Sequence, residues 1–74
     1  MTFDVAVDRV LASVSFQHPV THEDCAHVRD ALRAATSATM IEVHHQRDKV
    51  LVHVEHTSEG VPLVCRRTVE IKNA

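Results

Sequence analysis

The chain has 74 residues, of which 45% are hydrophobic and 24% are charged, and its formal net charge is −2 when the seven histidines are neutral. This length supports one hydrophobic core and therefore a single small domain, residues 1–74, and the composition excludes intrinsic disorder. No basic run exceeds the pair Arg66-Arg67, so we expect no nucleic acid among the partners.

The sequence also restricts the expected location of the protein. No apolar stretch approaches the roughly 20 residues that cross a bilayer, and the N-terminus lacks the basic start and apolar run of a signal peptide. Cys25 and Cys65 are too few for a disulfide framework. We therefore expect a cytoplasmic protein that has no membrane partner and keeps both cysteines as thiols.

The first predicted element is a helix over residues 3–15. Its hydrophobic residues fall within one arc of about 100° on a helical wheel; they are Phe3, Val7, Val10, Leu11 and Val14. Thr2 can cap this helix, and Asp4 suits the positive end of the helix dipole. A strand is the alternative, because the segment from Val10 to Phe16 is rich in valine and alternates.

A second helix is predicted from His22 to about Thr36. His18-Pro19 ends the preceding element, because the residue before a proline is pushed away from helical geometry. Thr21 is a good N-cap, and Asp24 at the third position approximates a capping box. The positions expected to face the core are Cys25, Val28, Ala31, Leu32 and Ala35.

From Met40 onward the hydrophobic period changes to two, which predicts strands. The first strand spans Met40–Gln46, the second residues 50–55 and the third residues 62–71. The first two are joined around Arg47-Asp48, and the last two are joined by residues 57–60, where Gly60 would take a positive φ. The third strand is expected to bury Leu63, Cys65, Val69 and Ile71 and to hold Arg67 at the core margin.

The strand pairing follows from the turn around Arg47-Asp48. Val43 is expected opposite Val52 on the buried face, and Glu42 opposite His53 on the outer face. The predicted fold class is thus α+β, with two N-terminal helices packed on one face of a three-stranded antiparallel meander (α-α-β-β-β). If the first element is a strand, the order becomes β-α-β-β-β with a four-stranded sheet, and the extra strand could cover Met40–Gln46.

Histidines and carboxylates on the outer face suggest a metal-binding hypothesis. Imidazole and carboxylate are suitable ligands for zinc or nickel, and the residues concerned are Glu42, His44, His53 and Glu55. The pairing places His44 opposite Leu51, however, so the four side chains do not converge on one point. A solvated polar face explains the same residues, and we assign no metal ligand and no cofactor.

A second group surrounds the start of the second helix and consists of His18, His22, Cys25 and His27. A thiolate would be favoured there by the helix dipole and nearby imidazolium groups. Cys25 is also a core position of the helix, and no orienting third group is visible, so a structural cysteine is the expectation. His45 is expected on the buried side of its strand, where protonation could act as a pH switch.

The function predicted from these observations is non-catalytic. The chain contains no Walker loop, dinucleotide fingerprint, CxxC pair, HExxH or GxSxG, so we expect no enzymatic activity and assign no catalytic residue. The strand Met40–Gln46 carries neither proline nor lysine to protect a free sheet edge. We therefore expect a small protein-interaction protein, which is either an adaptor or inhibitor that binds a larger protein partner or a homodimer formed by strand addition. A metal-binding or metal-sensing module is the alternative.

Overall fold

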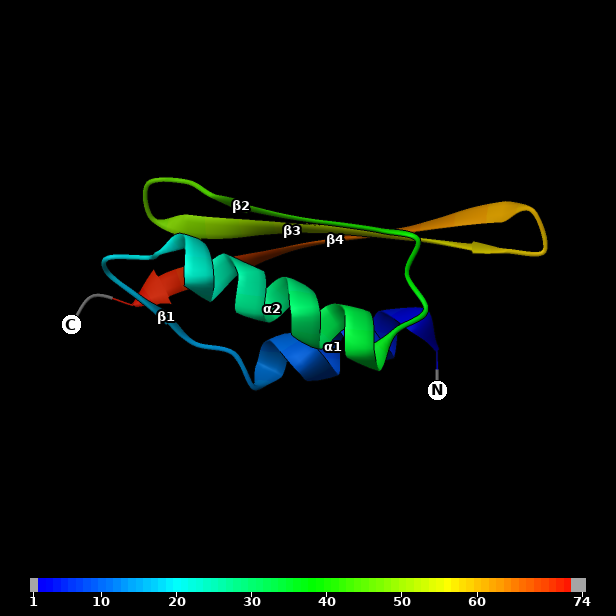
Figure 1. The fold of residues 1–74 in the computed structure, drawn as a ribbon, viewed down its shortest axis with the longest axis horizontal. Coiled ribbons are helices and arrows are strands. Elements are labelled where there is room, and N and C mark those ends of the chain that lie inside the picture. Colours follow the sequence, from blue (N-terminus) through cyan, green and yellow to red (C-terminus); the bar gives the residue numbers. More distant parts are fainter. Residues whose placement is uncertain (1, 73–74) are drawn as a thin grey trace.

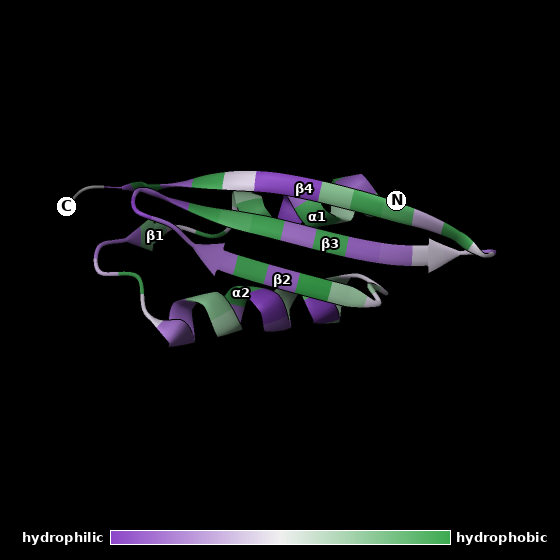
Figure 2. Ribbon diagram, turned by 90° about the horizontal axis from the view of Figure 1, so that it is seen from above, coloured by the Kyte–Doolittle hydropathy of each residue, from purple (hydrophilic) through white to green (hydrophobic). Residues whose placement is uncertain are grey.

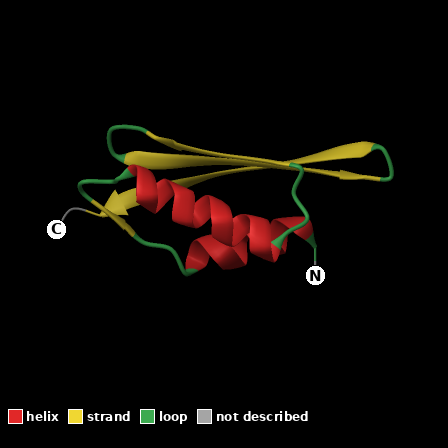
Figure 3. Cartoon of the chain, viewed as in Figure 1, coloured by secondary structure: helices red, strands yellow, loops and turns green. Residues whose placement is uncertain are grey.

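The computed structural model describes residues 2–72, which form two helices and four strands. In chain order these are α1 (Phe3–Ala12), β1 (Phe16–Gln17), α2 (His22–Ala35), β2 (Met40–His45), β3 (Lys49–Ser58) and β4 (Val61–Lys72). The strands form one sheet in the order β1-β4-β3-β2. Both helices lie on the same face of this sheet, as Figure 1 and Figure 3 show. The α+β class and the helical layer on one face are confirmed.

The predicted three-stranded sheet is wrong in its strand count, because β1 adds a fourth strand. Phe16 and Gln17 pair in parallel with Ile71 and Lys72 at the end of β4, so the sheet is mixed. Phe16 is only 3% exposed, and its side chain belongs to the core. A strand of two residues shows no measurable period in the sequence, and the burial of one aromatic side chain accounts for its position.

The first element is a helix as predicted, but it ends at Ala12. Thr2 caps it, since its Oγ1 accepts a hydrogen bond from the Val5 amide at 3.3 Å. The alternation that suggested a strand belongs partly to the segment after the helix, where Val14 is half-buried and Phe16 enters β1. The alternative order that begins with a strand is therefore wrong, although a short strand does follow the helix.

The second helix has the predicted start. The Asp24 amide donates to Thr21 Oγ1 at 3.2 Å, and the Thr21 amide donates to Asp24 Oδ2 at 2.9 Å, which completes the capping box. The helix ends at Ala35, and the hydroxyl and amide of Thr36 both bond to the Leu32 carbonyl. Val28 and Leu32 are its buried residues.

The predicted pairing of the first two long strands is confirmed. Val43 lies opposite Val52, and Glu42 lies opposite His53. The turn between β3 and β4 is shorter than predicted, with Glu59 at φ 52° and Gly60 at φ 78° at its tip. Two positive φ angles are typical of the turns that match the twist of a hairpin, and glycine adopts this conformation without strain.

The core lies between the helices and the sheet, and among residues 2–72 it contains nine buried residues, Val7, Phe16, Val28, Leu32, Val50, Val52, Val54, Cys65 and Ile71. Leu63 was expected among them, but it is 41% exposed. The hairpin of β3 and β4 extends past the ends of the helices, so nothing from the helical layer covers its tip (Figure 3). Within residues 2–72, no helix has the length and apolar character needed to cross a membrane.

Candidate protein-interaction surface

β2 forms one edge of the sheet, because the additional strand β1 pairs with β4 on the opposite side. The direction of its backbone groups follows from two turn hydrogen bonds. The Gln46 amide donates to the Lys49 carbonyl at 2.8 Å, and the Ile71 amide donates to the Asp48 carbonyl at 3.0 Å. Hydrogen-bonded and non-hydrogen-bonded pairs alternate along an antiparallel ladder. Glu42 and His44 therefore direct their backbone groups toward β3.

The other residues of β2 direct their amides and carbonyls away from the sheet. These residues are Ile41, Val43 and His45, and within residues 2–72 no hydrogen bond from outside the sheet reaches their backbones. Of these three residues, Val43 lies nearest the middle of β2, between Ile41 and His45. The edge thus offers alternating donors and acceptors to an additional strand.

α2 runs beneath and beside this edge, as the view from above in Figure 2 shows. Between the helix and the strand lie two adjoining hollows of about 360 and 310 Å³, which share His22, Cys25 and Val43. The first also includes Val20, Thr21, His44 and His45, and the second also includes Glu23, Ala26 and Arg29. We call this continuous depression the β2–α2 groove. It adjoins the open backbone of β2 at Val43.

Charged side chains border the groove on the helix side. Arg29 and Glu23 both line the second hollow. The ion pairs of residues 2–72 are His44–Glu42, His53–Glu55 and Arg67–Asp8, so neither Arg29 nor Glu23 is neutralised by a neighbour within 4.0 Å. Both groups can therefore meet charges of a binding partner.

Cys25 is half-buried in the floor of the groove, and its thiol is free. Burial raises the pKa of its thiol, and the Asp24 carboxylate raises it further. Burial likewise raises the pKa of the Cys65 thiol in the core. A raised pKa lowers the thiolate fraction at neutral pH and with it the nucleophilicity of the cysteine.

The structure does not assemble the histidine group predicted around Cys25. His22 lines the groove with Cys25, whereas His27 lines a different hollow beside Ser15 and Phe16, and His18 is exposed before α2. His45 joins His22 and Cys25 instead. Sequence reasoning missed this neighbour because it lies at the far end of the strand that follows α2, and no spacing in the sequence shows that this end returns to the start of the helix.

His45 was expected to be buried, and this prediction is wrong because the side chain is exposed. It lies at the last position of β2, beside the start of α2. The alternation of hydrophobic residues along β2 correctly predicts the face of the sheet on which His45 lies. Burial of its side chain would also require a helix that covers this end of the strand. The pH switch that depended on a buried His45 therefore has no structural basis.

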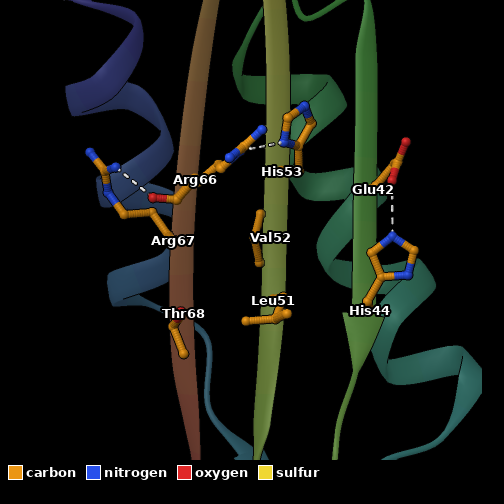
Figure 4. A pocket seen from close by; sticks show the side chains of 8 residues that line it. All are labelled: Glu42, His44, Leu51, Val52, His53, Arg66, Arg67 and Thr68. Carbon is orange, nitrogen blue, oxygen red and sulfur yellow. Dashed lines mark hydrogen bonds and ion pairs between the residues drawn. The ribbon is translucent and has the colours of Figure 1, made fainter.

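The outer face of the sheet holds the residues of the metal-binding hypothesis. Figure 4 shows this face, where a shallow hollow of about 650 Å³ is lined by both Glu42 and His53. His44 Nε2 lies 2.9 Å from Glu42 Oε2, and this hydrogen bond lowers the pKa of the Glu42 carboxyl. Arg66 Nε donates to His53 Nδ1 at 3.2 Å.

These contacts divide the four candidate ligands into separate pairs. His53 Nε2 lies 3.4 Å from Glu55 Oε1, while Glu42 is paired with His44. In the part of the chain that the structure describes, no group of three or more histidine, cysteine or acidic side chains could hold a metal ion. No observation in the described part of the chain favours the metal alternative.

Arg67 links the sheet to α1. It is partly exposed, and its Nε donates to Asp8 Oδ1 at 2.7 Å. This hydrogen bond lowers the pKa of the Asp8 carboxyl and raises that of the guanidinium. The pair joins residues 59 positions apart in the sequence and stands on the β4 side of the sheet, away from the groove.

Comparisons with protein-family models, with curated proteins and with solved structures gave no match to this chain.

Proposed function

We propose that this chain is a small non-catalytic protein-interaction protein that binds its partner by strand addition at β2. The observation that carries the proposal is the row of outward backbone amides and carbonyls on Ile41, Val43 and His45. Backbone hydrogen bonds supply affinity in this mode of recognition, and pockets for alternate side chains supply specificity. The adjoining groove provides such pockets.

The electrostatics of the groove support a binding role over a catalytic one. Its only thiol has a raised pKa, which disfavours a cysteine nucleophile. The groove combines half-buried side chains with charged ones, as interaction surfaces commonly do.

The test compares two prolines placed in free sheet edges. Val43→Pro removes an outward amide from β2, and Val64→Pro removes an outward amide from β4, where alternate residues between Pro62 and Glu70 direct their backbone groups away from β3. Neither substitution deletes a hydrogen bond between β3 and its neighbours. Val64→Pro is thus a matched control for the strain that proline introduces into a strand.

Wild-type chain and both variants, each immobilised on beads, are exposed to an extract of the cells that make the protein, and bound proteins are quantified by mass spectrometry. We expect a set of proteins that wild type and Val64→Pro retain and that Val43→Pro loses. Heteronuclear NMR spectra verify that both variants are folded. Equal retention by the folded Val43→Pro variant would exclude β2 as the binding edge.

A further inference from the structure

The β2–α2 groove differs from an ordinary free edge because α2 lies beneath and beside it, in the layer below the sheet (Figure 1 and Figure 2). An added strand lies about 4.8 Å from its neighbour in the plane of the sheet. α2 stands beneath and beside that position along β2 (Figure 2), and the hollows between them contact Val43 on one wall and Cys25 on the other. An added strand would therefore lie against the backbone of β2 on one side and over α2 on its lower face (Figure 2).

This arrangement argues against a second copy of the chain as the occupant. If two copies joined through antiparallel β2 strands, the sheet would continue into the partner, and both helical layers would lie on the same face of it (Figure 1). Because each α2 also extends beside its own β2 (Figure 2), the two α2 helices would overlap beneath the joined strands. A single extended segment brings no helical layer and avoids this conflict.

The floor of the groove specifies which side chains fit. Alternate residues of an added strand point toward the helix layer, as Val43 itself does. They would meet the half-buried Cys25 and Ala26 between the two hollows of about 360 and 310 Å³. Cys25 and Ala26 offer an apolar surface to these residues, which apolar side chains such as alanine or valine suit.

The charged side chains at the rim of the groove indicate which charge a ligand would carry there. The Arg29 guanidinium lines the groove and lies within 4.0 Å of no carboxylate among residues 2–72. The Glu23 carboxylate on the same hollow carries the opposite charge, and three imidazoles, from His22, His44 and His45, also border the groove. The preferred ligand therefore brings a carboxylate to Arg29.

We propose that the β2–α2 groove binds one short extended peptide segment that carries small apolar side chains toward Cys25 and an acidic side chain toward Arg29. This inference rests on the proposed function and adds the class of ligand and its placement. The peptide pairs with the backbones of Ile41, Val43 and His45, and it becomes the fifth strand of the sheet.

The experiment selects the ligand without assuming its sequence. A phage library that displays random ten-residue peptides is enriched on the immobilised wild-type chain, and the selected peptides are synthesised with a fluorescent label. Fluorescence anisotropy at low salt then gives their affinities for wild type, Val43→Pro, Arg29→Glu and Glu23→Gln. Val64→Pro and Arg9→Glu serve as controls, because they repeat the proline and the charge reversal away from the groove.

We expect selected peptides that combine acidic residues with alanine or valine. Val43→Pro should abolish their binding, and Arg29→Glu should weaken it by about tenfold, because attraction becomes repulsion. Glu23→Gln should strengthen binding by about two- to threefold, since it removes a like charge at the rim. Both controls should bind as wild type does.

Four outcomes would overturn this inference and leave the proposed function standing. Enrichment of basic peptides, or affinities unaffected by Arg29→Glu, would contradict the assigned ligand class. If no peptide is enriched while folded partners are still captured in a Val43-dependent way, the edge binds a folded protein. A concentration-dependent dimer that Val43→Pro abolishes would make a second copy the occupant. Selected peptides that bind Val43→Pro and wild type equally would contradict both proposals.

Discussion

At the scale of single residues, the ion pair of Arg67 and Asp8 joins the sheet to α1, with 2.7 Å between Nε and Oδ1. The hydrogen bond from Arg67 lowers the pKa of the Asp8 carboxyl below its ordinary value of 3.8. A carboxyl whose pKa is lower in the folded state stabilises the fold above the ordinary value. That stabilisation disappears as the pH falls through 3.8 toward the lower value of the folded state.

Replacement of Asp8 by asparagine should therefore have a pH-dependent effect on stability. At neutral pH we expect Asp8→Asn to have a lower free energy of unfolding than wild type. The difference should be smaller at roughly pH 2, because stability from a lowered pKa is lost as the pH falls below 3.8. Urea unfolding at the two pH values measures it, and Asp30→Asn, at another exposed carboxylate, is the control. A difference that does not change with pH would contradict this assignment.

The two cysteines lead to a prediction about reactivity. Burial raises the pKa of both thiols, so the folded chain should react with iodoacetamide at neutral pH more slowly than the chain unfolded in urea. Mass spectrometry of the labelled peptides separates Cys25 from Cys65. Rapid modification of Cys25 in the folded chain would support a nucleophilic role instead.

At the scale of the elements, the capping box of α2 matters because it fixes the helix that forms one wall of the groove. Thr21 and Asp24 exchange side-chain and backbone hydrogen bonds of 2.9 and 3.2 Å. These bonds satisfy amides that the first turn of a helix leaves free. The capping box thus fixes the start of α2, the helix that carries Cys25 and Ala26.

Replacement of Thr21 by alanine removes the acceptor of this box. We expect the free energy of unfolding to fall by about 1 kcal/mol, whereas Thr21→Ser keeps the oxygen and should cost only a few tenths of that amount. Thermal or urea unfolding gives both values. Equal stability of Thr21→Ala and wild type would show that the box does not stabilise α2.

The sequence predicts elements well where a local signal repeats. The period-two pattern and the turn at Arg47-Asp48 set the pairing of β2 with β3, and the structure has the same register. β1 lacks such a signal, because two residues cannot show a period and its pairing partner is at the far end of the chain. Local patterns report local geometry, and long-range pairing depends on the assembled core.

The candidate site was predictable only in part, because it also depends on how distant elements pack together. The free edge follows from the strand pattern, and β2 does lie at the edge. The groove depends on where α2 packs relative to Val43, which no spacing in the sequence encodes. The exposure of His45 and Leu63 likewise depends on how far the helical layer reaches over the sheet.

At the scale of the whole molecule, the sheet is longer than the layer of helices that covers it. The chain measures 43 × 19 × 17 Å, and the hairpin of β3 and β4 accounts for the long dimension beyond the helices (Figure 1). The exposed apolar residues of this hairpin are Val61, Leu63 and Val64. The stability of the protein should therefore be concentrated in the covered half.

Two leucines test this division of the molecule. Leu32 is 0% exposed between α2 and the sheet, whereas Leu63 is 41% exposed on the hairpin. We expect Leu32→Ala to lower the free energy of unfolding by about 2–5 kcal/mol and Leu63→Ala by less than about 1 kcal/mol. Urea unfolding measures both, and similar losses would mean that the hairpin is covered in solution.

Amide hydrogen exchange along β2, followed by NMR on the dilute chain, tests the open edge most directly. The amides of Ile41, Val43 and His45 should exchange rapidly, and those of Glu42 and His44, which bond to β3, should exchange more slowly by about a hundredfold or more. This alternating pattern would establish the free edge on which the account depends. Equal protection of Val43 and His44 would contradict it, because the edge would then be occupied already.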